Sequence, residues 1–250
     1  MKGLFTTVAF HKAAESATLL ALQPIADQHV TVRGDDLTVP ELNQILAAAI
    51  AGVGVTRAQL QSPSLRVLFL EDIGYDMGSE SFAGYPDLLA DHKDAPIPLI
   101  TSEKLNVYTI HTTDGWALIW LGDGPIAPLP GVIRTIRAVP DVHSVADVWT
   151  NSTLTFGQTL PAGRYQVAGM RAFGTNLLAA RLVFVGYSWR PGVPAGLTNA
   201  TVDYPVFRRG RFGAFGEFEF DQPPSVDLLG TGVSASEELY LDLIQVRAGR

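Results

Sequence analysis

The sequence contains no cysteine, and this absence excludes a disulfide framework, a zinc–thiolate site and a cysteine nucleophile. Charge is also scarce, since 17% of the 250 residues are Asp, Glu, Lys or Arg, against about 25% in an ordinary soluble domain. Long apolar runs are missing too. The most apolar stretch, residues 46–55, is far shorter than the roughly 20 residues that a membrane-spanning helix needs. We therefore expect no membrane span.

The shortage of charge leaves apolar surface that must be buried. Hydrophobic residues make up 47% of the chain and its mean hydropathy is +0.18. Interfaces between subunits are one destination for this surface, and a large core under a sparsely charged exterior is an equal alternative. The basic residues are 14 Arg and 4 Lys, a bias found at the centres of interfaces but also produced by a GC-rich genome.

Charge is divided unevenly along the chain. Residues 1–125 carry 15 acidic and 7 basic residues, while residues 126–250 carry 10 and 11. The total of −7 argues against a dedicated nucleic-acid binder, which would show a basic domain or stripe. The first residues lack the apolar run of a signal peptide, so we expect the protein to be made and kept in a cytoplasm.

Many short strands between Gly/Pro turns predict a mainly β fold, an antiparallel sandwich of jelly-roll type. Residues 105–111 and 115–121 predict one hairpin around Thr113–Gly115, and residues 164–173 and 177–187 predict a second. Further strands are expected at 64–70, 217–221 and 239–247, with surface loops at 122–131 and 190–196.

One helical insert is expected near residues 39–51. Thr38 and Glu41 fit a capping box with Pro40 in the first turn, and the apolar residues that follow have helical spacing up to Gly52. The chain shows no internal repeat, so we expect a single elaborated sandwich over residues 1–250. The proline-rich stretch 122–131 leaves an alternative of two tandem sandwiches, 1–125 and 132–250.

Catalytic signatures are missing from the sequence. There is no Gly-x-Ser-x-Gly elbow, phosphate-binding loop or His-Glu-x-x-His helix. None of the five histidines has metal-ligand spacing, and His111 and Asp114 are taken as a polar hairpin end. Glu217, Glu219 and Asp221 share one strand face, which is more typical of a solvated surface than of a calcium site or a glycosidase pair. We expect no enzyme, no metal and no cofactor.

The segment 207–216 is the most unusual part of the sequence because Arg and Phe residues alternate there with Gly. Such a composition can stack single-stranded nucleic acid, or it can dock into a neighbouring subunit with Phe as anchors and Arg facing carboxylates. We favour the second role over the first, and an ordinary irregular loop between strands is the alternative to both. The predicted interface residues are Phe207, Arg208, Arg209, Arg211, Phe212 and Phe215.

The chain from about residue 150 to 250 resembles the jelly-roll coat proteins of viruses and phages. The residues that carry the likeness are a strand opening from a Pro-Gly turn at 160–167, a return strand at 179–184 and a long loop from Trp189-Arg190-Pro191-Gly192. The resemblance implies a shell of many copies whose loops make the contacts between subunits. The helix at 39–51 is not explained by it.

The sequence leaves three candidate functions to be tested. The first is a self-assembling structural protein, a virion capsid subunit, whose partners are copies of itself and other structural proteins of the same particle. Contact with nucleic acid is allowed but not indicated. The second is a glycan-binding sandwich that uses Trp116, Trp120, Trp149 and Trp189, although the spacing of Trp116 and Trp120 is more typical of a core. The third is a cupin-like or glycosidase-like enzyme.

Overall fold

The computed structural model describes residues 4–13, 16–67, 89–197, 204–234 and 236–248. Contacts within the chain divide it into two compact units. The first, which we call the N-terminal unit, is Thr7–Gly124, and the second, the C-terminal unit, is Pro125–Arg250 together with Met1–Thr6. The break after Gly124 lies within the predicted boundary 122–131. Whether the chain folds as one domain or as two stays a prediction, because it depends on how each unit folds alone.

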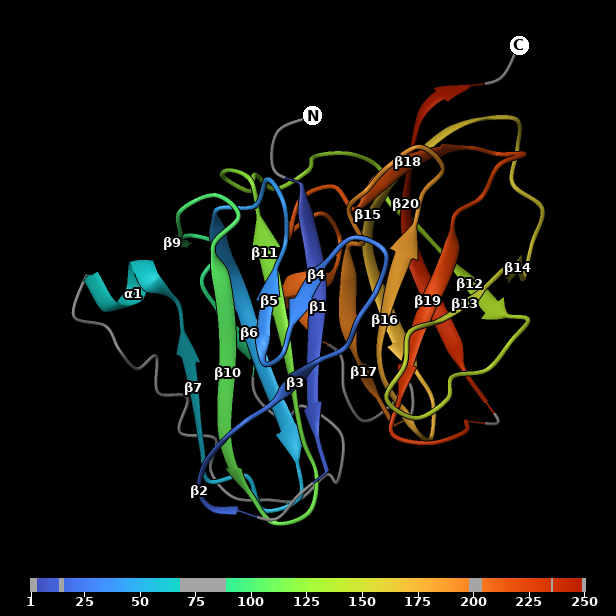
Figure 1. Cartoon of the computed structure of the whole chain (residues 1–250). Helices are drawn as coiled ribbons and strands as arrows, with labels where there is room; N and C mark the ends of the chain where they lie inside the picture. The colour runs from blue at the N-terminus through green and yellow to red at the C-terminus, as the bar shows by residue number, and fades with distance from the viewer. Residues whose placement is uncertain (1–3, 14–15, 68–88, 198–203, 235, 249–250) are drawn as a thin grey trace. The chain divides into compact units, whose positions relative to one another are not determined.

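The N-terminal unit consists of two sheets (Figure 1). The six-stranded sheet has the order β3-β1-β11-β6-β8 with β9 also on β6, and the five-stranded sheet has the order β2-β10-β5-β4 with β7 also on β10. The bounds of these elements are β1 Phe5–Lys12, β2 Ser16–Ala21, β3 Gln23–Pro24, β4 Thr31–Arg33, β5 Asp36–Thr38, β6 Gln44–Gly52, β7 Arg57–Gln61, α1 Pro63–Val67, β8 Leu89–Asp91, β9 Ile97–Pro98, β10 Lys104–His111 and β11 Gly115–Gly122.

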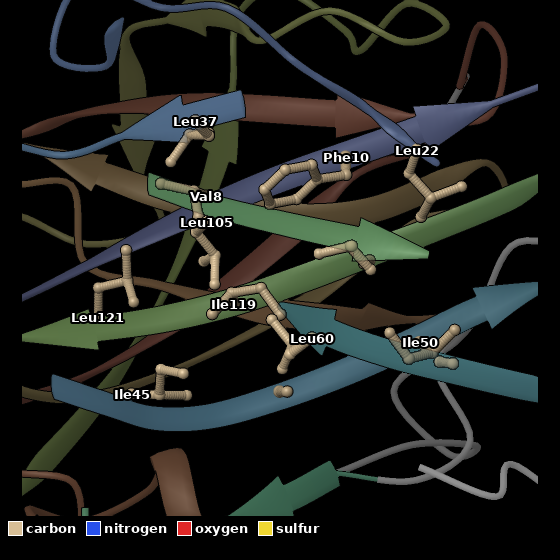
Figure 2. Close-up of a cluster of buried hydrophobic side chains, with 14 of the residues drawn as sticks. Val8, Phe10, Leu22, Leu37, Ile45, Ile50, Leu60, Leu105, Ile119 and Leu121 are labelled. Atoms are coloured by element: carbon tan, nitrogen blue, oxygen red, sulfur yellow. The ribbon is translucent and has the colours of Figure 1, made fainter. Parts of the chain in front are cut away.

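Aliphatic side chains of both sheets form the core of this unit. Figure 2 shows Ile45 and Ile119 from the six-stranded sheet with Leu60 and Leu105 from the five-stranded sheet. Each of these four side chains is at most 2% exposed. Burial of apolar area from water is the main source of stability for such a sandwich.

The predicted helix near residues 39–51 is wrong, because this region forms the strand β6. β6 is the neighbour of β11 and of β8 and β9, so it is an interior strand of its sheet. Residues 45–51 are buried on both faces, which removes the period-two alternation and leaves a continuous apolar run that resembles a buried helix. The capping box also fails, since Thr38 lies in β5 and Glu41 has a φ of 67°.

The first predicted hairpin has the correct strands and the wrong partner. β10 pairs with β2, β5 and β7, whereas β11 pairs with β6, so the turn at residues 112–114 passes from one sheet to the other. This turn is bonded to the β6–β7 connection, where the Thr112 amide donates to the Val53 carbonyl at 2.8 Å. The Val53 amide in turn donates to the carbonyl of Asp114 at 3.1 Å. Two arches that cross between the sheets are thus bonded side by side.

The strand predicted at 64–70 is also wrong as far as it can be compared, because Pro63–Val67 is the short helix α1 and residues 68–70 lie outside the described residues. Pro63 suits the first turn of a helix, where no amide hydrogen is needed. The carboxylate of Glu103 accepts hydrogen bonds from the Ser64 amide and from the hydroxyls of Ser62 and Ser64. These bonds fix the start of the helix.

The C-terminal unit is built on a nine-stranded sheet with the order β13-β19-β16-β17-β15-β20-β12-β14, in which β18 also pairs with β15. Its pairings are antiparallel except for a short parallel contact of β15 with β17. The bounds are β12 Arg134–Pro140, β13 Thr150–Ser152, β14 Leu154–Phe156, β15 Gly163–Phe173, β16 Leu177–Val183, β17 Gly192–Gly196, the 3-10 turn η1 Pro205–Phe207, β18 Gly216–Glu219, β19 Ser225–Gly230 and β20 Glu238–Ala248.

The second predicted hairpin and the predicted loop at 190–196 are also wrong. β17, which contains the Pro/Gly-rich residues 192–196, is a buried strand between β15 and β16 and separates the two strands that were expected to pair. Its composition of Gly, Val, Pro and Ala is unusual for a strand. Local propensity predicts a loop here, and pairing with two long neighbours overrides it.

Antiparallel sheets dominate the described residues, so the prediction of a mainly β fold is confirmed, and these sheets accord with a jelly-roll type. Residues Arg33–Asp36 form the tight connection of β4 to β5, with Gly34 at a φ of 61°. Among the residues that the structure describes, no helix has the length and apolar character needed to cross a membrane.

Candidate assembly site

The three phenylalanines of the segment 207–216 lie in the core of the C-terminal unit. Phe207, Phe212 and Phe215 are each at most 1% exposed. The rings of Phe212 and Phe215 pack edge-on against Phe5, with ring centroids 4.9 and 5.0 Å apart. Their expected role as anchors that enter a neighbouring subunit is therefore wrong in this form, because the rings already occupy their own unit.

Arg208 holds this segment to the sheet through Asp242 of β20. Its Nε and Nη2 atoms donate to the two carboxylate oxygens at 2.8 and 3.1 Å, and the amide of Arg209 donates to Oδ2 at 2.9 Å. The hydroxyl of Thr135 donates to Oδ1. Burial opposes ionisation of Asp242, but these hydrogen bonds outweigh it and hold the pKa of the carboxyl below its usual value.

The close approach of the segment to the sheet depends on Gly169 of β15. A Cβ atom at this position would lie 2.7 Å from the carbonyl oxygen of Phe207 and 2.8 Å from the amide nitrogen of Arg209. Glycine therefore allows two backbones to touch. Arg209 and Arg211 are exposed beside this contact. Neither side chain forms an ion pair with another described residue.

A groove of about 670 Å³ opens at the start of β12 in the C-terminal unit. Arg134 and Leu243 are directly opposite in the β12–β20 ladder, so their side chains share a face. Arg134 is the one charged residue among the described residues that line the groove. The full lining is Gly131, Val132, Arg134, Ile136, Gln158, Thr159, Leu160, Pro161, Tyr165, Leu243, Ile244 and Gln245.

The floor and the rim of the groove differ in exposure. Ile136 and Leu243 on the floor are buried, whereas Val132 on the rim is 80% exposed. The hydroxyl of Tyr165 donates to the carbonyl of Pro161 at 2.7 Å. Its polar end is thus already used within the chain, and the groove presents a mixture of apolar and polar surface with a cation at its edge.

At the other end of β12 the chain displays valines on a short loop, residues 141–148, which we call the valine loop. Val142, Val145 and Val148 are 50%, 38% and 48% exposed. Val145 and Val148 form an antiparallel bridge, so their side chains lie on one side of the loop. Asp147 between them has a φ of 59°, which closes the turn.

Buried groups fix the backbone of the valine loop. Glu237, 1% exposed, accepts a hydrogen bond from the Ser144 amide at 3.0 Å and lies 3.1 Å from Nδ1 of His143. The Val142 amide donates to the Ser152 hydroxyl at 2.8 Å. The backbone of the loop is therefore held in place while its apolar side chains are exposed to solvent. The hydrophobic effect alone would favour burial of these side chains.

Asp141 gives the loop a fixed negative charge. Hydrogen bonds from the hydroxyls of Thr153 and Thr155 lower the pKa of its carboxyl, which is fully exposed. The sequence contained one pattern in this loop that the prediction did not use, namely a valine at every third position from Val142 to Val148. No signal pointed to the groove, because its lining comes from β12, β15, β20 and the loops at 131–132 and 158–161.

The other candidate residues do not form a site. Glu217 and Glu219 pair with Arg164 and Arg247 at 2.8 and 3.0 Å. Within the described part of the chain, no cluster of three or more His, Asp or Glu side chains could hold a metal ion. His111 is buried and lies 2.7 Å from the Thr109 hydroxyl, so it is not an exposed hairpin end.

Three of the four tryptophans considered for glycan binding are covered. Trp116 and Trp120 are at most 5% exposed, in agreement with the core assignment. The ring of Trp149 is covered by the guanidinium of Arg181, 3.9 Å from the ring centroid. A sugar ring would need a flat, open aromatic face, and none of these three residues offers one.

Comparison with known proteins gives little further information. No family model matches the chain, and no curated protein matches it. A solved structure that matches is the major capsid protein P2 of bacteriophage PM2, with 11% sequence identity, 98% coverage of each chain and a TM-score of 0.27. A TM-score of this size does not establish a shared fold, so the function has to be argued from the surface of the chain itself.

Proposed function

We propose that this protein is a structural subunit that assembles with copies of itself, and that the assembly is the shell of a virion. The observation that carries the proposal is the uneven distribution of exposed apolar side chains. Ten large hydrophobic residues are exposed among the described residues, and nine of them belong to the C-terminal unit. Exposed apolar surface of this kind is typical of contacts between proteins.

The distribution of charge also favours contacts through the C-terminal unit. The acidic half of the chain, residues 1–125, would repel its copies, whereas residues 126–250 are close to neutral. We propose that Arg209 and Arg211 of the predicted interface segment remain available to carboxylates of a neighbouring copy, since both are exposed. Arg208 is excluded from this role because its guanidinium is paired with the carboxylate of Asp242.

The proposal is tested by measuring the size of the purified full-length chain over a range of concentration and salt. Sedimentation velocity and negative-stain microscopy should reveal rings, tubes or shells, and a single-copy species under every condition would overturn it. The double variant Arg209→Ala/Arg211→Ala should need a higher concentration to assemble. Arg208→Ala is a poor choice for this test because it leaves the buried Asp242 without its partner.

A further inference from the structure

The two apolar features of the C-terminal unit lie at opposite ends of one strand. The groove lies at the start of β12, with Arg134 at its edge, and the valine loop begins directly after Pro140, where β12 ends. Because a strand rises about 3.3 Å per residue, the seven residues of β12 separate the two features by roughly 20 Å.

The two features are also complementary in character. The groove offers apolar side chains such as Ile136 and Leu243 together with a cation, and the valine loop offers three exposed valines and the carboxylate of Asp141. The loop cannot reach the groove of its own chain, because the extended strand β12 holds the two apart. A second copy can supply what one copy cannot bring together.

We propose that the groove at the start of β12 receives the valine loop of a second copy, so that copies join head to tail along the direction of β12. This inference rests on the proposed self-assembly and names the contact that would drive it. Asp141 of the incoming loop faces Arg134, and Val145 and Val148 enter the groove. Opposite charges at such a contact fix its register and exclude other orientations.

The rigidity of the loop favours this contact. Since Glu237 and Ser152 already hold the loop backbone, little conformational freedom is lost when the valines enter the groove. A contact between two different patches uses one groove and one loop of every copy. Such a contact leaves a free groove at one end of a chain of copies and a free loop at the other, so it grows into a ring where the rotation between copies closes and into an open filament where it does not.

The test uses two full-length variants that block the two patches separately. Arg134→Glu reverses the charge of the groove, and Val145→Asp/Val148→Asp places charge on the loop. Each variant alone should need about tenfold or more higher concentration to assemble than the wild type, a change that one lost contact can produce. Val185→Asp is the matched control, because Val185 is 78% exposed and lies outside both patches.

Mixing the two variants distinguishes this contact from a general loss of assembly. The loop variant retains an intact groove and the groove variant retains an intact loop, so an equimolar mixture should give a species of two copies and nothing larger. Sedimentation velocity measures this species, and circular dichroism checks that each variant folds. Val132→Asp replaces Arg134→Glu if the latter does not fold, since the Val132 side chain is in solvent.

The outcomes separate the inference from the proposed function. If the wild type assembles and both variants assemble at the wild-type concentration, the head-to-tail contact is refuted and self-assembly stands. If both variants fail to assemble but their mixture gives no two-copy species, the groove accepts some other segment and the inference is wrong. A wild-type chain that never assembles overturns both.

Discussion

Replacement of Asp242 by Asn tests whether the segment 207–216 is held by a buried charge. Asn has the shape of Asp but lacks its charge, so the guanidinium of Arg208, whose side chain is 14% exposed, would lose its counter-ion. Breaking a buried ion pair by removing one partner costs about 3–5 kcal/mol. Because Asn keeps one acceptor oxygen, we expect a loss near the lower end, about 3 kcal/mol of the free energy of unfolding.

Urea denaturation followed by tryptophan fluorescence measures this loss, and Glu238→Gln on the same strand is the matched control. Glu238 pairs with Arg137 on an exposed part of the sheet, where the side chains are 33% and 49% exposed, so its removal should change stability little. If the two variants unfold at the same urea concentration, the idea that Asp242 holds the segment is refuted.

The effect of Asp242 should also depend on pH. Its pKa in the folded protein is lowered, so its contribution is complete above the pKa of the unfolded chain, about 3.9, and is lost as the pH falls through the folded value. The difference between wild type and Asp242→Asn should therefore be constant from pH 7 to about 5 and shrink in more acidic solution. A difference that grows with acidification would contradict this reasoning.

Three further predictions follow. Gly169→Ala should cost about 1–3 kcal/mol in urea denaturation because its Cβ meets two backbone atoms, whereas Gly157→Ala, where the nearest atom is 3.5 Å away, should cost much less. Glu237→Ala leaves the buried Ser144 amide without an acceptor, so the free energy of unfolding should fall by about 1–3 kcal/mol. Amide hydrogen exchange in residues 142–148 should become faster in the same variant. Residues 7–124 expressed alone should unfold cooperatively if the N-terminal unit is a domain, and a non-cooperative transition would favour the single sandwich over residues 1–250.

The sequence predicted a strand most directly where apolar and polar residues alternate. In β20, Leu239, Leu241 and Leu243 alternate with more polar residues, and the period of two is plain. In β6 both faces are buried, so the same rule gave a helix. Hairpins failed for another reason: a turn within one sheet and an arch between two sheets use the same residues, and the choice depends on partners such as Val53 that are far away in the sequence.

The site was harder to predict because its chemistry depends on distant partners. The mixture of Arg and Phe at 207–216 correctly marked an unusual segment. It could not show that Asp242, 34 residues from Arg208, would form an ion pair with that residue. Nor could it show that Phe5 would pack against the rings of Phe212 and Phe215. An exposed loop and a folded-back loop have the same composition. The difference lies in whether a small residue such as Gly169 allows the backbone to approach.

The same reasoning separates what stabilises the C-terminal unit from what remains for a partner. Arg208 and the phenylalanines are satisfied within the chain, so substituting them should lower stability first and assembly only as a consequence. Val132, Val145 and Val148 are exposed, and substituting them should leave the urea midpoint unchanged while it shifts the concentration needed for assembly. A variant set that moved both quantities together would show that the exposed valines belong to the fold and not to an interface.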